Sequence, residues 1–161
     1  MTWRGCTSVR ADWDTTWIQM AETFASSRSY CSRRKASAII VDPAQNVVAI
    51  SYNGLPAGQL NRNDECQAWC PRAQDGPATL GYADCLMIHA EAHSLLRADR
   101  SRMLGGTIYV NTAVCRDCAK LISNSGLARV VMRVRDDDAH RGPDEVIEHL
   151  RWLGFEVVTC A

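Results

Sequence analysis

Two short motifs, His89-x-Glu91 and Cys115-x-x-Cys118, place the strongest constraint on how this chain can fold. They are well separated in the sequence, and each is predicted to open a helix after a loop or the end of a strand. One imidazole and two thiolates form a ligand set that suits zinc. Three protein ligands leave the fourth tetrahedral position to water, which is typical of catalytic sites. The fold must therefore bring the starts of two helices to one point.

Glu91 strengthens the interpretation of this group as a catalytic site. It lies two residues after His89, where a carboxylate can handle protons beside a metal without binding it. Zinc lowers the pKa of a bound water toward ~7, which supplies hydroxide at neutral pH. Each motif alone is weak, because Cys-x-x-Cys is often a redox or structural pair and His-x-Glu is usually only a helix start. Their order and shared context favour a catalytic zinc site.

Hydrophobic periodicity and turn residues predict an alternation of helices and strands. Helices are expected over residues 12–28, 89–99, 115–123 and 144–153, and strands over residues 36–41, 47–52, 107–111, 128–134 and 155–159. The first two strands form a predicted hairpin, and a charged loop is expected over residues 135–141. This order predicts an α/β fold with a mixed five-stranded sheet and helices on both faces. A length of 161 residues predicts a single domain over residues 1–161.

Charge and composition argue against several classes of protein. Lys plus Arg and Asp plus Glu both number 18, so the formal net charge is zero. A neutral chain is a poor candidate for binding long nucleic acid through bulk electrostatics. No signal peptide is visible, and the apolar runs are far shorter than the ~18 residues of a membrane span. A cytoplasmic protein with no membrane partner is expected, and its eight cysteines then favour metal binding over disulfides.

Several segments resemble known deaminases. His-x-Glu followed by Pro-Cys-x-x-Cys is the signature of zinc nucleobase deaminases, and the chain departs from it at Val114, where proline is expected. Residues 51–58 (SYNGLPAG) resemble the GYNGxPxG segment of the deoxycytidylate (dCMP) deaminase family. Residues 31–41 (CSRRKASAIIV) resemble its C-x-R-x-x-V-G-A-x-I-V segment. The resemblance runs from about residue 15 to residue 158 and is densest with phage and actinobacterial members.

The resemblance implies a fold and a reaction. The fold is the three-layer α/β/α sandwich of the cytidine deaminase type. The reaction is the zinc-dependent hydrolysis of dCMP to dUMP and ammonia in pyrimidine deoxynucleotide metabolism. His89, Cys115 and Cys118 would bind the zinc, while Glu91 would take a proton from water, pass it to N3 and protonate the leaving amine.

Substrate contacts are also implied by the resemblance. They are expected at Arg33, Asn53, His93, Tyr109 and Ala113. Arg33 is the favoured phosphate ligand because guanidinium forms paired, charge-assisted hydrogen bonds with phosphate. Arg34 and Lys35 are alternatives, and the three residues could instead form a solvated turn.

Two departures from the family pattern bear on substrate and regulation. His93 replaces the asparagine of H-A-E-x-N-A and shares a helix face with His89. A substrate-facing His93 is favoured over a packed histidine, and the change makes a 5-substituted dCMP an alternative to dCMP as the substrate. Many family members are hexamers with dCTP and dTTP as effectors, so a homo-oligomer (hexamer or dimer) is expected. Ser51, where the family has glycine, restricts the backbone and puts this effector control in question.

Four further cysteines, Cys31, Cys66, Cys70 and Cys85, flank or lie within a long predicted loop over residues 53–84. Some family members carry a second, structural zinc built from these regions, and four thiolates would form such a closed site. The alternative is a set of buried free thiols.

Three other functions stay open. One is deamination of a free nucleoside or of an antibiotic-type cytosine compound, which would need no phosphate site. Another is deamination of a base in nucleic acid, against which the neutral charge argues. The third is a catalytically inactive nucleotide-binding regulator, against which Glu91 argues.

Overall fold

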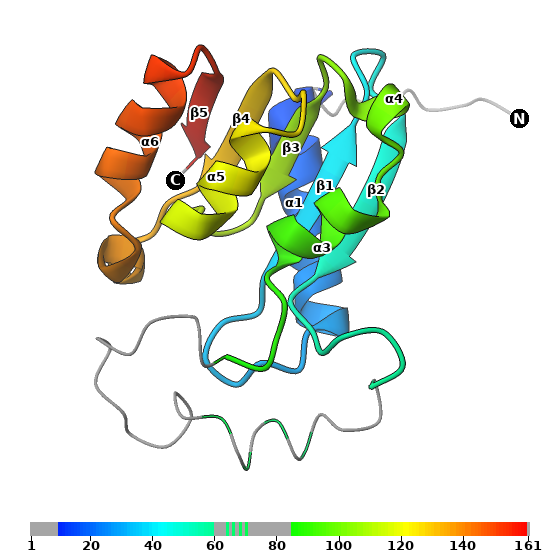
Figure 1. The fold of residues 1–161 in the computed structure, drawn as a ribbon, viewed down its shortest axis with the longest axis vertical. Coiled ribbons are helices and arrows are strands. Elements are labelled where there is room, and N and C mark those ends of the chain that lie inside the picture. Colours follow the sequence, from blue (N-terminus) through cyan, green and yellow to red (C-terminus); the bar gives the residue numbers. More distant parts are fainter. Residues whose placement is uncertain are drawn as a thin grey trace, which may run out of the picture.

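The fold is built on one mixed sheet of five strands: β1 (Ser37–Val41), β2 (Val47–Tyr52), β3 (Thr107–Val110), β4 (Arg129–Arg133) and β5 (Glu156–Cys160). Their order across the sheet is β2-β1-β3-β4-β5 (Figure 1). The structure is a computed structural model that describes residues 10–59, 64, 66, 68, 70 and 85–160. Most of the loop predicted over residues 53–84 lies outside the described residues.

The strand pairing combines a hairpin with parallel crossovers. β1 is antiparallel to both β2 and β3, whereas β3, β4 and β5 run parallel. The predicted turn between β1 and β2 is present. In it, Asp42 Oδ1 accepts hydrogen bonds from the backbone N–H groups of Ala44 and Asn46, and Gln45 adopts a positive φ of 68°.

Within residues 10–59 and 85–160, the helical segments that accompany the sheet are α1 (Trp13–Arg28), α3 (Ala90–Arg97), α4 (Arg100–Met103), α5 (Arg116–Ser123), the 3₁₀ helix η3 (Asp136–Arg141) and α6 (Pro143–Trp152). The sequence predicted the four longer helices but missed α4, which has too few residues to show a period. It also treated η3 as a charged loop. Within the described ranges, no helix has the length and apolar character needed to cross a membrane.

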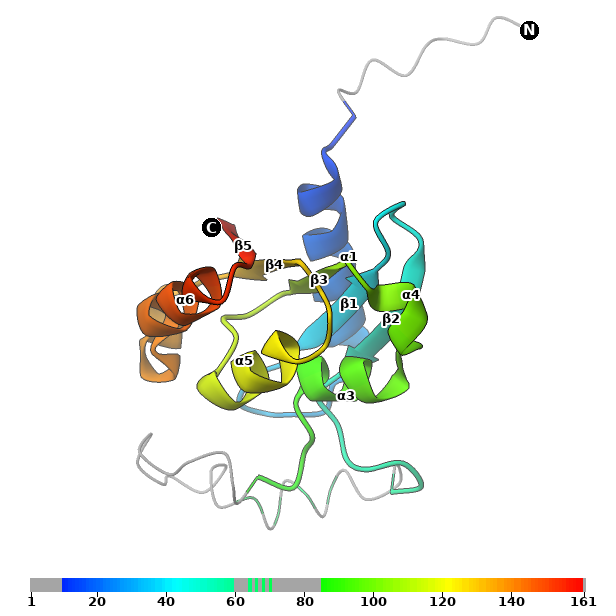
Figure 2. The ribbon, with the colours of Figure 1, turned by 45° about the horizontal axis from the view of Figure 1, so that its top comes forward.

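The helices form a layer on each face of the sheet (Figures 1 and 2). Ile39, Tyr109 and Val131 pack with α1 on one face. Ile40 and Ile108, which alternate with them along the strands, pack with residues of α5 and α6 on the other face. The predicted α/β/α sandwich with a mixed five-stranded sheet is therefore confirmed.

Antiparallel pairing places the carboxyl end of β3 beside the start of β1. Ala38 pairs with Val110, and Asn111, which follows β3, receives a hydrogen bond on Oδ1 from the backbone N–H of Ser37 at 2.8 Å. Asn111 Nδ2 also donates to the carbonyl of Lys35 at 3.2 Å. The segment before β1 and the turn after β3 thus lie together at one edge of the sheet, where ligand sites of α/β proteins occur.

A half-buried ion pair joins α1 to the sheet. Arg129 donates to both carboxylate oxygens of Asp14 at 2.7 Å, and the hydroxyl of Tyr109 donates to Asp14 at 3.1 Å. The Arg129 hydrogen bonds hold the pKa of Asp14 below its usual value. Because the folded state has the lower pKa, the ion pair stabilises the fold above the unfolded pKa of ~3.9. This stabilisation is lost as the pH falls through the lower, folded pKa.

We expect Asp14→Asn to lower the free energy of unfolding by about 1 kcal/mol at pH 7. The deficit relative to wild type should shrink below about pH 4, because Asp14 then takes up a proton in the unfolded wild-type chain before it does so in the folded one. Urea unfolding of the wild type and Asp14→Asn at pH 7, 5 and 3.5 measures this difference in the free energy of unfolding. Glu148→Gln, an exposed position of α6, serves as a control that should match wild type at each pH. A deficit that is the same at pH 7 and 3.5 would contradict the ion-pair explanation.

Candidate active site

The three predicted metal ligands come together at the starts of α3 and α5. His89 and Cys115 each precede their helix in an extended backbone conformation, and neither side chain caps its own helix. His89 Nδ1 lies 3.5 Å from Cys115 Sγ and 3.4 Å from Cys118 Sγ. Among the described residues, this is the one group of three such side chains whose ligand atoms all lie within 4.8 Å of one another. The predicted convergence of the two motifs is present.

The donor set fits a zinc ion with an open position. Cys115 and Cys118 are each 3% exposed, so their thiolates would be shielded from water by the core. Glu91 is also buried, and in the described structure its Oε1 has no hydrogen-bond partner. A buried carboxylate oxygen without a protein partner beside two thiols and an imidazole fits a site that binds a polar ligand. Two soft thiolates and one imidazole are the ligands that zinc prefers.

Burial and mutual contacts shift the pKa values of the groups in this site. Burial raises the pKa of Glu91. The hydrogen bond between the thiols lowers the pKa of Cys115 and, with burial, raises that of Cys118. Burial acts to lower the pKa of His89, but the hydrogen bond to Cys115 and the charge of Glu91 outweigh it and raise the pKa. Metal binding requires both thiolates and a neutral imidazole, so an ion would displace these protons.

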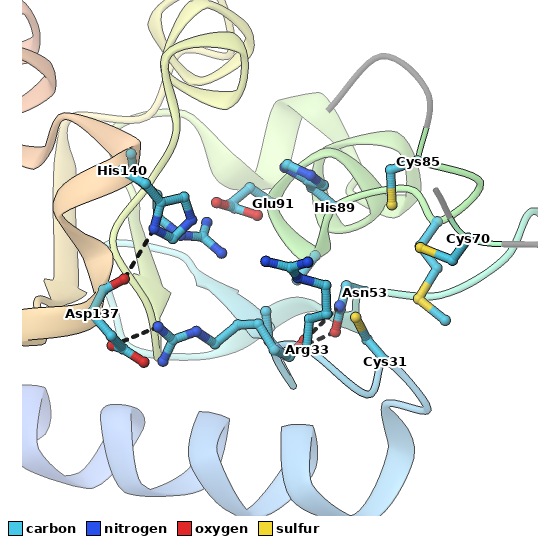
Figure 3. Close-up of a pocket in the computed structure, with 14 residues that line it drawn as sticks. Cys31, Arg33, Asn53, Cys70, Cys85, His89, Glu91, Asp137 and His140 are labelled. Atoms are coloured by element: carbon cyan, nitrogen blue, oxygen red, sulfur yellow. Dashed lines mark hydrogen bonds and ion pairs between the residues drawn. The ribbon is translucent and has the colours of Figure 1, made fainter. Parts of the chain in front are cut away.

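A cavity of about 280 Å³ opens beside the ligand group (Figure 3). His89, Ala90 and Glu91 form part of its wall. Its basic side chains are Arg33, Arg34, His140 and Arg141, and its acidic ones are Asp137 and Glu91. The volume is close to the lower end of small-molecule sites. The cavity thus combines a metal-ligand group with a predominantly basic wall, which suits a small anionic ligand.

The three neighbouring basic residues Arg33, Arg34 and Lys35 differ in their contacts and in their position relative to the cavity. Arg34 Nη2 lies 2.6 Å from Asp137 and 3.1 Å from Asp138, so carboxylates compensate its charge. Lys35 Nζ donates to the carbonyl of Ser26 at 3.0 Å, at the end of α1, and does not line this cavity. Figure 3 shows the Arg33 side chain extending into the cavity toward His89 and Glu91. Of the three neighbouring basic residues, Arg33 is the one whose side chain extends toward the predicted metal ligand His89.

Asn53 lines the cavity, but its side chain is occupied by the protein backbone. Its Oδ1 accepts hydrogen bonds from Ala36 N at 2.8 Å and from Ser29 Oγ at 2.6 Å. Its Nδ2 donates to the carbonyl of Arg34 at 2.9 Å. In this structure Asn53 therefore fixes the conformation of the segment that carries Arg33 and Arg34, a role that the sequence did not suggest.

Two other predicted substrate contacts lie away from the cavity. The His93 ring is 6% exposed, and its Nδ1 lies 3.1 Å from the carbonyl oxygen of Tyr52 on β2, which matches the alternative of a packed histidine. Tyr109 points to the α1 face, where burial raises its pKa to about 12. The alternation of side chains along β3 puts Ile108 and Val110 on the face of the metal-bearing helices and Tyr109 on the other. That alternation was the sequence signal against Tyr109.

Residues of η3 form a further side of the cavity, whereas Ala113, another predicted substrate contact, is bound to η3 and does not line the cavity. Ala113 is fully buried, its N–H donates to Asp138 Oδ2 at 3.3 Å, and its carbonyl accepts from Arg141 Nη1 at 3.1 Å. Sequence reasoning missed Asp137, His140 and Arg141 as cavity residues because the charged run 135–141 resembles a solvated loop. The only signal was its dense alternation of acidic and basic side chains.

A second, much smaller pocket of about 20 Å³ lies next to the cavity. It is lined by the second predicted cysteine group, Cys31, Cys66, Cys70 and Cys85. Cys66 is buried, and burial, followed by the charges of the other three thiols, raises its pKa. Cys31, Cys70 and Cys85 lie on the same side of the main cavity in Figure 3. No three of these described sulfur atoms are as close together as the ligand atoms of the His89 group.

Comparisons with known proteins agree with the site. Residues 11–134 match the family described as the cytidine and deoxycytidylate deaminase zinc-binding region. The deoxycytidylate deaminase of Mycobacterium phage D29 is 39% identical over 128 residues, which cover 76% of this chain and 94% of the phage protein. The deoxycytidylate deaminase of Saccharomyces cerevisiae is 33% identical over 151 residues, which cover 92% of this chain but 45% of the yeast protein.

The fold has a close counterpart among solved structures. The dCMP deaminase from the cyanophage S-TIM5, crystallised in complex with dCMP and dUMP, matches with a TM-score of 0.63 at 23% identity. The match covers 95% of this chain and 100% of the cyanophage chain. Sequence and fold agree with the resemblance seen in the motifs, and the chain belongs to the cytidine and deoxycytidylate deaminase family.

Proposed function

We propose that this protein is a zinc-dependent hydrolase that converts dCMP to dUMP and ammonia. The observation that carries the proposal is one cavity lined by His89, Glu91 and Arg33, in which His89 also belongs to a compact group with the buried Cys115 and Cys118. The similarity to the phage D29 deoxycytidylate deaminase, which spans 94% of that protein, supports the same substrate class.

His89, Cys115 and Cys118 would hold the zinc ion, which when bound supplies the activation of a water molecule. Glu91 is the proton carrier of the reaction. Its buried carboxylate takes a proton from the water whose oxygen adds to C4, and delivers that proton to N3 of the base. Glu91 then takes the second proton of the same water from the new C4 hydroxyl and passes it to the amine, so that C4 becomes a carbonyl as the C4–N bond breaks and ammonia leaves. The raised pKa of Glu91 suits both steps, because such a carboxyl group can accept a proton and return it.

The basic wall would bind the 5′-phosphate. Arg33 offers a planar guanidinium that can form paired hydrogen bonds with phosphate oxygens. Asn53 supports phosphate binding indirectly. Its side chain fixes the backbone of Arg34 and Ala36, which are close to Arg33 in the sequence. A 5-substituted dCMP stays an alternative substrate, although the packed position of His93 no longer favours it.

The second cysteine group would hold a structural zinc. Cys31, Cys66, Cys70 and Cys85 line one small pocket, and four thiolates form a closed tetrahedral site. The ion would draw the sulfur atoms closer than they lie here and would anchor the segment that carries Cys66 and Cys70. The homo-oligomeric state and the dCTP and dTTP effectors stay predictions from the resemblance, and the cytoplasmic location stays a prediction from the sequence pattern.

Ammonia release from a substrate panel tests the proposed reaction. The panel holds dCMP, 5-methyl-dCMP, 5-hydroxymethyl-dCMP, cytidine and deoxycytidine. We expect turnover of monophosphates with dCMP preferred, and a fall in kcat of about 10²- to 10⁴-fold in Glu91→Gln with zinc retained. Glu148→Gln should match wild type. Turnover of nucleosides alone, or none with tight dCMP binding, would favour the nucleoside deaminase or the inactive regulator instead.

The phosphate contact is tested by Arg33→Ala. We expect the KM for dCMP to rise about 10- to 100-fold, since hydrogen bonds to a charged group are lost, while kcat/KM for deoxycytidine changes little. Arg97→Ala removes an exposed arginine of α3 and serves as the matched control. An equal loss for dCMP and deoxycytidine would show that Arg33 does not bind the phosphate.

Zinc stoichiometry tests the second site. Mass spectrometry of the metal content should give two zinc ions per chain in the wild type and one in Cys66→Ser, with a lower Tm because a structural ion is lost. Cys160→Ser, outside both cysteine groups, should keep two ions. A single zinc in the wild type that Cys66→Ser retains would rule out the structural site.

A further inference from the structure

One buried carboxylate connects three segments around the cavity. Asp138 is fully buried within η3. Its Oδ1 lies 3.1 Å from Arg34 Nη2, before β1, and 3.2 Å from Arg141 Nε, at the end of η3. Its Oδ2 accepts hydrogen bonds from the backbone N–H groups of Ala113 at 3.3 Å and Arg135 at 3.2 Å. No other described carboxylate of the site has contacts with all of these segments.

These contacts hold the turn that leads to the metal ligands. Asp138 binds the N–H of Ala113, and Arg141 Nη1 binds its carbonyl at 3.1 Å, so η3 fixes both sides of this residue. Cys115 follows two positions later and is the N-cap residue directly before α5. Rotation of the backbone at Ala113 would break both hydrogen bonds and would move the Cys115 thiol relative to His89.

The charge of Asp138 is also required by its surroundings. Arg34 and Arg141 have side chains that are 17% and 8% exposed, so water compensates little of their charge. Removing a carboxylate from such a group leaves buried positive charge unbalanced, which is strongly unfavourable. Asp137 also contacts Arg34, but its side chain is 70% exposed. Asp137 therefore cannot take over the role of a carboxylate buried between the two arginines and Ala113.

We propose that Asp138, acting with Arg141, is a positioning residue that fixes the Ala113–Cys115 turn and thereby the geometry of the metal centre. It touches neither the metal ligands nor the cavity, and it acts through Ala113 and Arg141. The inference rests on the proposed zinc centre but not on dCMP as the substrate. Its test therefore uses the metal centre and needs no substrate.

Cobalt substitution reports the geometry of thiolate ligands directly. We would compare the absorption spectra of the Co²⁺-loaded wild type, Asp138→Asn and Asp136→Asn. Asp136 is the exposed first residue of η3 and provides the matched control. The part of the spectrum that disappears in Cys115→Ser belongs to this centre, whichever other thiolates bind cobalt.

We expect Asp138→Asn to shift the Cys115-dependent bands and to release zinc from this centre to a chelator at least ten-fold faster than wild type. Asp136→Asn should match wild type in both measurements. A folded Asp138→Asn whose Cys115-dependent bands match the wild type would overturn the proposal, even with a lowered Tm. A wild type with no Cys115-dependent bands would overturn the zinc centre itself, and the positioning role with it.

Arg141→Gln tests the same connection if Asp138→Asn does not fold. This variant removes the guanidinium that binds the carbonyl of Ala113 but keeps the carboxylate that binds its N–H. We expect a shift of the same Cys115-dependent bands. Bands identical to those of the wild type would overturn the proposal.

Discussion

The antiparallel pairing of β1 with β3 is the constraint on which the site depends. It sets the start of β1 beside the end of β3, so that the basic segment before one strand faces the metal-bearing turn after the other. Two buried asparagines strengthen this junction. Asn53 binds the backbone of Arg34 and Ala36, and Asn111 binds that of Lys35 and Ser37. A one-residue slip in this register would turn the inward side chains outward and separate the two halves of the cavity.

Charge balance is the second condition for a working cavity. Arg34 and Arg141, whose side chains have little access to water, line the same cavity as His89 and Glu91. Asp138 compensates these arginines from within the protein, whereas Arg33 is directed into the cavity. The arrangement allows a positive wall to face an anionic ligand while the surrounding fold stays stable. The same carboxylate connects that wall to the turn before Cys115.

Much of the fold and the metal ligands could be predicted because both depend on local patterns. The alternation of elements was visible in the periodicity, and β2 and α1 begin and end close to where the sequence placed them. Tyr109 and His93 were misplaced as cavity residues because a family motif does not say which face of an element points to the ligand. The alternation along β3 and the packing of α3 on β2 decide that. η3 was missed because its buried carboxylate, Asp138, also binds Arg34 and Ala113, which are far away in the sequence.

The sequence by itself determined that two helix starts carry one imidazole, two thiols and a carboxylate, since local patterns place the helix starts and nitrogen and sulfur ligands of this kind suit zinc. It also determined the mixed sheet, because strand and helix periods differ. Only the tertiary structure decided that Asn53 supports the backbone, that His93 packs against β2 and that Asp138 lies between two arginines and Ala113. The physical reason is that a hydrogen bond or an ion pair between distant segments depends on strand register and layer packing, which leave no local pattern in the sequence.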